Sequence, residues 1–245
     1  MNAADFYTGI IPDVYTALRS TTFDATHYVD FVEKAGQPAL ELGCGEDGPF
    51  LELIKRGIDV EGVDSSRDML DRCKSRADAA SLRIVTYCQP MQQLALPRSY
   101  RAIYRAGPTF NLLPDDDTAY QALEGIAGHL QPGGQAMVPL WIPSPTPEQE
   151  IGLTREAVTA EGAIARYTIE FENYDVAGRT RRTHTRYELH KGQQVEIVQR
   201  DWIIHWHTPE GLAELSHAAS LEITHMTPVV DGEFTAYLQR ADTSD

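Results

Sequence analysis

The chain has few cysteines, few basic residues and no long apolar run. Its 245 residues include only three cysteines, Cys44, Cys73 and Cys88, with no Cys-x-x-Cys pair. This spacing argues against a disulfide framework or a cysteine-built zinc site. No apolar run approaches the roughly 20 residues that a bilayer-spanning helix needs. The N-terminus lacks the basic start and apolar stretch of a signal peptide. These absences predict a cytoplasmic protein.

The charge balance is strongly acidic. Twenty-one basic residues stand against 36 acidic ones, which gives a formal net charge of −15. A field of this sign repels phosphate backbones and anionic lipids. We therefore expect a small-molecule partner, and neither nucleic acid nor a membrane. The one basic cluster, at Arg179, Arg181, Arg182 and Arg186, is either the solvated rim of a hairpin or a docking point for an anionic group.

The first part of the chain alternates between strand-like and helix-like patterns with short links. This alternation predicts βαβ units and a parallel sheet with helices on both faces. Strands are expected at 39–42, 58–64, 82–88, 101–106 and 135–141, and helices at 23–35, 49–56, 66–79 and 118–130.

The pattern changes after Trp141, where three prolines interrupt the chain. Residues 163–207 contain three alternating, strand-like stretches that are typical of an antiparallel meander. Thr208 and Pro209 then fit the N-cap and first residue of a helix, and two strands follow at 221–226 and 233–238. The predicted fold class is α/β: a Rossmann-like, seven-stranded, mostly parallel sheet with helices on both faces and an inserted antiparallel β cap. The expected divisions are an N-terminal helical lid at 1–35, the core at 36–142, the cap at 143–207 and a return to the core at 208–245.

The most informative segment is the glycine turn Glu41-Leu42-Gly43-Cys44-Gly45. Glycines at the end of a strand let the backbone turn sharply and let a ligand approach the main chain. Asp64 ends the next strand, where a carboxylate can accept hydrogen bonds from ribose hydroxyls. Together these features predict a nucleotide-type ligand. The spacing of Gly43, Gly45 and Gly48 also fits the dinucleotide fingerprint of dehydrogenases.

The glycine turn, the acidic segment Val63-Asp64-Ser65-Ser66 and the later turn Pro132-Gly133-Gly134 resemble the class I S-adenosylmethionine (SAM)-dependent methyltransferases over about residues 23–142 and the closing strands. Glu41 and the Pro-Gly-Gly turn favour this family over NAD-dependent dehydrogenases, which remain an alternative. The resemblance implies methyl transfer from SAM to a nitrogen or oxygen of a small molecule, such as an aminosugar or a nitrogen heteroaromatic of azapteridine (toxoflavin) type. A non-catalytic SAM-binding protein or a cyclase is a further alternative.

The resemblance also implies which residues hold the cofactor. Two departures from the family pattern stand out. Asp47 replaces a frequent third glycine and is interpreted as a helix N-cap, and no acid follows the third strand, which leaves adenine recognition to backbone groups or Gln92. The predicted cofactor-binding residues are Glu41, Gly43, Cys44, Gly45, Asp64, Ser65, Met69, Met91, Gln92 and Ala106.

Aromatic residues and histidines in the lid, after the fifth strand and in the cap are candidates for the acceptor site. Tyr15 and His205 are the predicted catalytic residues, and Tyr7, Trp141, Tyr187 and His207 are predicted to bind the acceptor. Strand alternation places Trp202, Ile204 and Trp206 on a core face and His205 and His207 on a mostly polar face. No metal is predicted, because no acidic or cysteine partner of the two histidines is recognisable. The sequence leaves both a monomer and a homodimer open.

Overall fold

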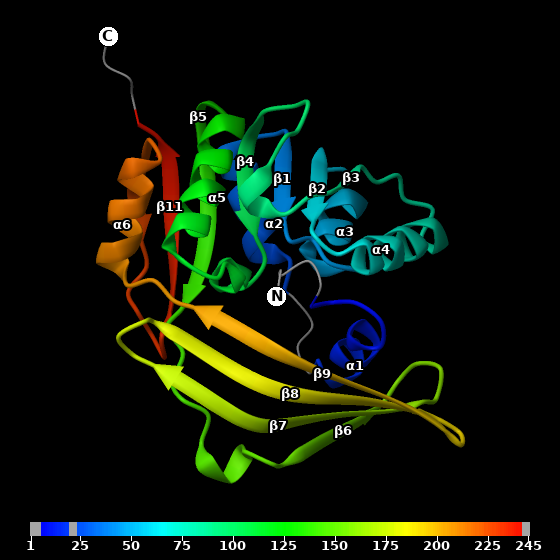
Figure 1. The fold of residues 1–245 in the computed structure, drawn as a ribbon. Coiled ribbons are helices and arrows are strands. Elements are labelled where there is room, and N and C mark those ends of the chain that lie inside the picture. Colours follow the sequence, from blue (N-terminus) through cyan, green and yellow to red (C-terminus); the bar gives the residue numbers. More distant parts are fainter. Residues whose placement is uncertain (1–5, 20–23, 242–245) are drawn as a thin grey trace.

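A computed structural model describes residues 6–19 and 24–241, and within them the chain builds two sheets (Figure 1). Residues 1–5 and 20–23 of the predicted lid and residues 242–245 of the predicted final segment lie outside the described residues. None of the helices in the described ranges combines the length and apolarity required to cross a membrane.

The larger sheet has seven strands in the order β10-β11-β5-β4-β1-β2-β3. Strands β3, β2, β1, β4 and β5 pair in parallel, whereas β11 runs antiparallel to both β5 and β10. This confirms the predicted seven-stranded, mostly parallel sheet. Its strands are β1 (Ala39–Leu42), β2 (Val60–Asp64), β3 (Thr86–Cys88), β4 (Tyr100–Arg105), β5 (Leu130–Trp141), β10 (Leu221–Met226) and β11 (Glu233–Arg240).

Helices cover both faces of this sheet and form two apolar clusters with it. On one face pack α2 (Thr26–Ala35), α3 (Gly48–Lys55) and α4 (Arg67–Ala79). On the other pack α5 (Asp116–His129) and α6 (Pro209–Ala218). The helix starts follow local chemistry, because the side chains of Asp47, Ser66, Asp115 and Thr208 each accept a hydrogen bond from a backbone N–H of the helix that follows.

The smaller sheet is antiparallel and lies across one end of the larger one (Figure 1). Its strands are β6 (Thr154–Val158), β7 (Ile164–Asp175), β8 (Thr180–Lys191) and β9 (Gln194–His205). In β8, Thr183, Thr185, Tyr187 and Leu189 are buried while the residues between them are partly exposed. The alternation predicted from the sequence is therefore present, with Tyr187 and Leu189 packing against helix α1 (Ile11–Leu18).

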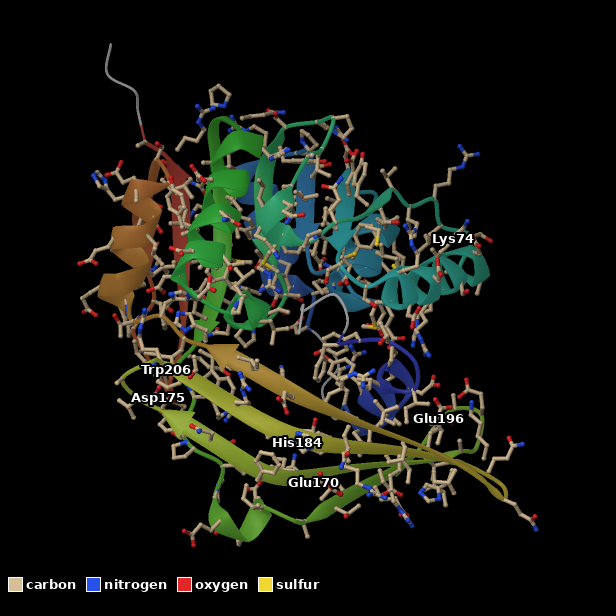
Figure 2. The ribbon with its side chains drawn as sticks, in the orientation of Figure 1. Lys74, Glu170, Asp175, His184, Glu196 and Trp206 are labelled. Atoms are coloured by element: carbon tan, nitrogen blue, oxygen red, sulfur yellow. The ribbon has the colours of Figure 1, made fainter. Side chains whose placement is uncertain are left out.

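The opposite face of the smaller sheet carries polar side chains in contact with one another. Figure 2 shows His184 and Glu170 on neighbouring strands, where His184 Nε2 lies 3.5 Å from Glu170 Oε2. His184 Nδ1 lies 2.6 Å from Asp201 Oδ1. Each ring nitrogen of this histidine thus faces its own carboxylate.

Two expected strand starts need correction, and one strand was not predicted. The third strand begins at Thr86 rather than at residue 82, because Leu82 and Ile84 pack against the α2–α4 cluster before the ladder begins. The fifth strand begins at Leu130, so the Pro-Gly-Gly turn lies within it. Strand β6 was not predicted, because its residues are largely exposed and polar.

Candidate functional site

The glycine turn follows β1 and is fixed to the end of β2. Gly43 and Gly45 have φ values of +69° and +60°, which favour glycine. Gly45 N donates to Asp64 Oδ2 at 2.9 Å, and Ser66 N donates to Asp64 Oδ1 at 2.8 Å. A Cβ on Gly43 would lie 3.0 Å from Arg105 Nη2. The turn therefore has backbone contacts on one side and a buried guanidinium on the other.

A cavity of about 260 Å³ lies over this turn. One end is formed by the glycine turn and strand ends, and the other by aromatic side chains from the N-terminal segment, β5 and β9. Of the predicted residues, it is lined by Tyr7, Tyr15, Glu41, Gly43, Cys44, Gly45, Asp64, Met69, Ala106 and Trp141.

Helix α1 and the segment before it cover the cavity and are bonded to the core. Ser66 Oγ donates to Tyr7 O at 2.6 Å, and Arg72 pairs with Asp13 at 2.7 Å. Thr16 also donates to the buried Glu46. The Arg19 guanidinium contacts Asp47 at 2.9 Å.

Glu41 is a fully buried carboxyl group in the wall of the cavity. Tyr104 Oη donates to its Oε2 at 2.7 Å, while its Oε1 has no hydrogen-bond partner among residues 6–19 and 24–241. Burial raises the pKa of Glu41 to about 8, opposed by the Tyr104 hydrogen bond. The site therefore offers an acceptor atom with unmet hydrogen-bonding capacity.

Arg105 is a buried residue behind the glycine turn that the sequence reasoning missed. Its side chain is fully buried at the end of β4, and Nε donates to Leu42 O at 3.3 Å. Within the described part of the chain, Nη1 and Nη2 have no hydrogen-bond partner. Burial lowers the pKa of Arg105 to about 9, opposed by Asp64 and Glu41. The available signal was a charged residue ending the apolar strand Ala102-Ile103-Tyr104.

A smaller cavity of about 60 Å³ is lined by the residues expected near adenine. Ser65, Met91 and Gln92 line it together with Asp64 and Gly43. Met69, by contrast, lies beside the glycine turn, where its Cε would be 3.5 Å from a Cβ on Gly45. Burial raises the pKa of the Cys44 thiol well above its usual value, so this thiol does not serve as a nucleophile at neutral pH.

The aromatic end continues into a side cavity of about 220 Å³. Tyr187 lines this side cavity with Tyr167, and Tyr7, Tyr15 and Trp202 border both spaces. Burial raises the pKa of Tyr7 well above its usual value, so its phenol stays neutral.

The structure places His205 and His207 outside both cavities. His205 Nε2 lies 2.9 Å from Asp116 Oδ1, and His207 packs beside Phe110. The expected polar face is wrong, because β9 ends at His205 and both imidazoles become buried where the chain passes between the sheets and α5. The expected core face is present, because Ile204 and Trp206 are buried and Trp202 packs against an apolar cluster; Trp202 and Ile204 also line the main cavity.

Asn111 was also missed, and it joins the cavity wall to the end of β9 at His205. Its Nδ2 donates to Trp141 O at 2.8 Å and to His205 O at 3.0 Å, and its Oδ1 accepts from Trp141 N at 3.0 Å. One buried amide thus positions both Trp141 and the end of β9.

Sequence comparison gives a family match and two curated relatives. The family model described as a methyltransferase domain matches residues 39–134. The cypemycin N-terminal methyltransferase of a Streptomyces species is 29% identical over 103 residues, covering 42% of this chain and 41% of the relative. The dTDP-3-amino-3,4,6-trideoxy-alpha-D-glucopyranose N,N-dimethyltransferase of Streptomyces venezuelae is 25% identical over 138 residues, covering 56% and 52%. The chain thus spans about half the length of the curated relatives it matches.

Solved structures show the same fold over a longer stretch. The SAM-bound amino pentose methyltransferase from Micromonospora echinaspora, involved in calicheamicin biosynthesis, has a TM-score of 0.69 and 19% identity, with 96% of this chain and 98% of that chain covered. The family match coincides with the glycine turn, Asp64 and the Pro-Gly-Gly turn. Residues 39–134 thus match a methyltransferase domain, and the described chain shares its fold with SAM-dependent methyltransferases of known structure.

Proposed function

We propose that this protein transfers a methyl group from SAM to a nitrogen of a small-molecule acceptor. The observation that carries the proposal is one cavity with a nucleotide-type end and an aromatic end. Gly43, Gly45 and Asp64 line the first, and Tyr15 and Trp141 line the second. A donor and an acceptor bound in one enclosed space react as if within one molecule.

Glu41 and Asp64 in the cavity wall, and Arg105 behind the glycine turn, suit SAM as the cofactor. Asp64 stands where ribose hydroxyls can donate to it, as the second strand end of such folds requires. Glu41 Oε1 and the Arg105 Nη atoms are buried groups of opposite chemistry, each without a hydrogen-bond partner within residues 6–19 and 24–241. In this proposal, Glu41 accepts from the amino group of the methionyl part and Arg105 donates to its carboxylate. When bound, SAM supplies a methyl group activated by a sulfonium.

The chain's own part in the reaction is orientation and exclusion of water. No histidine is among the described residues that line the two cavities. A neutral amine needs no base before it attacks, whereas an alcohol does. Nitrogen is the methylated atom that we propose, and the names of the curated relatives support it. In this proposal Tyr15 orients the acceptor, and His205, whose backbone O accepts from Asn111, supports the cavity wall.

The aromatic end favours an amine-bearing sugar or a flat nitrogen heterocycle. Faces of Tyr and Trp attract cationic and flat polar groups. The names of the curated relatives point to nitrogen acceptors on an aminosugar and a peptide N-terminus. The azapteridine-type acceptor raised by the sequence stays a prediction, which rests on stacking alone.

Calorimetry with SAM and with NAD tests the cofactor assignment. We expect SAM and S-adenosylhomocysteine to bind and NAD not to bind. Asp64→Ala should weaken SAM binding by about 1–3 kcal/mol, the usual loss for a removed buried hydrogen-bonding group. The exposed Asp71 of α4 gives the matched control Asp71→Ala, which should bind SAM like the unchanged protein. Binding of NAD in preference to SAM would support the dehydrogenase alternative instead.

An acceptor panel tests the transfer itself. S-adenosylhomocysteine release should be followed with a nucleotide-linked aminosugar, a peptide with a free N-terminus and an azapteridine. We expect turnover with a small nitrogen acceptor, reduced by Trp141→Ala with SAM affinity retained. SAM binding without release for any acceptor would favour the non-catalytic alternative.

A further inference from the structure

Two histidines and an aspartate meet where the smaller sheet joins the core. Asp116 is the first residue of α5, His205 ends β9, and His207 follows just before α6. His205 Nε2 and His207 Nδ1 lie 2.9 Å and 3.3 Å from the same atom, Asp116 Oδ1. One potential ligand atom from each of the three residues lies within 4.8 Å of the other two. The intervening Trp206, labelled in Figure 2, marks this junction.

The hydrogen bonding of these imidazoles is incomplete. His207 is fully buried, yet neither ring nitrogen has a hydrogen-bond partner in the part of the chain that the structure describes. His205 is also buried, and its Nδ1 likewise has no hydrogen-bond partner among the described residues. Buried polar side chains nearly always have partners, and an exception calls for an explanation such as a bound ion. Of the three clustered ligand atoms, His205 Nε2 is bonded to Asp116 Oδ1, whereas His207 Nδ1 has unmet bonding capacity and lies beside the same oxygen.

A neighbouring arginine orients the Asp116 carboxylate toward the two imidazoles. Arg179 donates to Oδ2, which leaves Oδ1 directed at the two imidazoles. A ligating carboxylate is commonly oriented by a second hydrogen bond of this kind. The Asp116 side chain is 41% exposed, so an ion can reach the cluster from solvent.

A second histidine cluster in the same sheet provides a contrast. His184 lies between Asp201 and Glu170, and each ring nitrogen faces its own carboxylate. Its hydrogen-bonding needs are met without an ion. The Asp116 cluster differs because two imidazoles share one carboxylate oxygen.

We propose that Asp116 Oδ1, His205 Nε2 and His207 Nδ1 bind a divalent transition-metal ion. Two imidazoles and one carboxylate are ligands that Zn²⁺ and its neighbours accept, and three protein ligands leave a position for water. The ion ties the end of β9 to the start of α5. Because Asn111 bonds both His205 O and Trp141 O, binding also fixes the wall of the aromatic cavity. The three ligand residues lie outside the lining of the cavity proposed for methyl transfer, so ion binding can be measured without SAM or acceptor.

Metal titration of the whole chain tests the site. Protein stripped with a chelator and dialysed should be titrated with ZnCl₂ by calorimetry and with CoCl₂ by visible absorption. We expect one ion per chain, Co²⁺ ligand-field bands and a higher melting temperature with Zn²⁺. Asp116→Asn, at a partly exposed position, should weaken binding by more than about 100-fold, because loss of an outer-shell partner alone costs about 10- to 100-fold.

Two further variants keep the result interpretable. His207→Ala should also abolish the cobalt bands, whereas the matched control His184→Ala should keep both the bands and the affinity. Circular dichroism confirms that each variant is folded. The proposal is overturned if the unchanged protein binds no ion at micromolar Zn²⁺, or if folded Asp116→Asn binds it as tightly. Equal loss in His184→Ala would likewise overturn it.

Discussion

The two sheets differ in the burial of their strands and in the hydrogen bonding of their charged side chains. All four residues of β1 in the larger sheet are buried, whereas β8 in the smaller sheet alternates between buried and partly exposed residues. The larger sheet holds the charged groups Glu41 and Arg105 in its interior with unmet hydrogen bonds. In the smaller sheet, charged residues form ion pairs near the surface. The unmet hydrogen bonds of the larger sheet therefore lie beside the cavity where the cofactor is expected. The smaller sheet also has buried atoms without a hydrogen-bond partner among the described residues, namely Arg181 Nε, Trp202 Nε1 and His205 Nδ1.

The arginines of the smaller sheet support this contrast. Arg182 pairs with Asp201 at 3.7 Å and Arg186 with Glu188 at 2.7 Å. Arg181 stacks over Trp141 with 4.7 Å between the guanidinium carbon and the ring centroid. The basic cluster of the sequence thus consists of residues with partners inside the chain, which favours the solvated rim over an anion dock.

The largest expected difference between the two sheets is in how the free energy of unfolding depends on pH. Burial raises the pKa of Glu41 from 4.5 to about 8, so the native state retains a proton that the unfolded chain loses. Without cofactor, stability should fall as the pH rises from about 4.5 to about 8, by at most about 5 kcal/mol. Glu41→Gln should remove this fall. Urea unfolding between pH 5 and 9 measures it.

Glu188 of the smaller sheet is the matched control. Arg186 and His190 lower the pKa of Glu188, so its contribution to stability is present at neutral pH and disappears in acid. Glu188→Gln should cost less than about 1 kcal/mol at pH 7. If both variants showed the same pH dependence, the contrast between the sheets would not hold.

The second difference concerns apolar residues. Leu40 of β1 is fully buried, whereas Ile197 of β9 is 47% exposed. Leu40→Ala should lower the free energy of unfolding by about 2–5 kcal/mol through loss of packing, and Ile197→Ala by less than about 1 kcal/mol. Denaturant unfolding at pH 7 measures both. A large loss in Ile197→Ala would reveal that the outer face of the smaller sheet is covered.

The smallest expected difference is a gain in stability, whereas the substitutions of apolar residues above lower it. Replacing the unpaired guanidinium in Arg105→Met should raise stability by about 1–4 kcal/mol, because a desolvated charge is removed, and should weaken SAM binding. Arg166 of the smaller sheet pairs with Glu156 at 2.7 Å near the surface, and Arg166→Met should change stability by less than about 1 kcal/mol. Thermal unfolding and calorimetry give the two readouts. Higher stability with unchanged SAM affinity would remove Arg105 from the cofactor site.

Much of the fold was predictable because its signals are local. The Asp47 cap, the Thr208–Pro209 helix start and the alternation in β8 each depend on residues within a few positions of one another. Strand β6 lacked such a signal, because its exposed residues show no buried face. Arg105 was missed for a related reason, since nothing local distinguishes a buried arginine at a strand end from a solvated one.

The sequence alone determined the glycine turn, the carboxylate at Asp64 and the parallel order around them, since backbone conformation and strand polarity follow from nearby residues. Only the tertiary structure decided which residues far apart in the sequence lie in contact. Asp116 begins one helix and His205 ends a strand 89 positions later, yet the packing of the two sheets brings them within 2.9 Å. Contacts of this kind depend on how whole elements pack, and sequence spacing carries no record of that geometry.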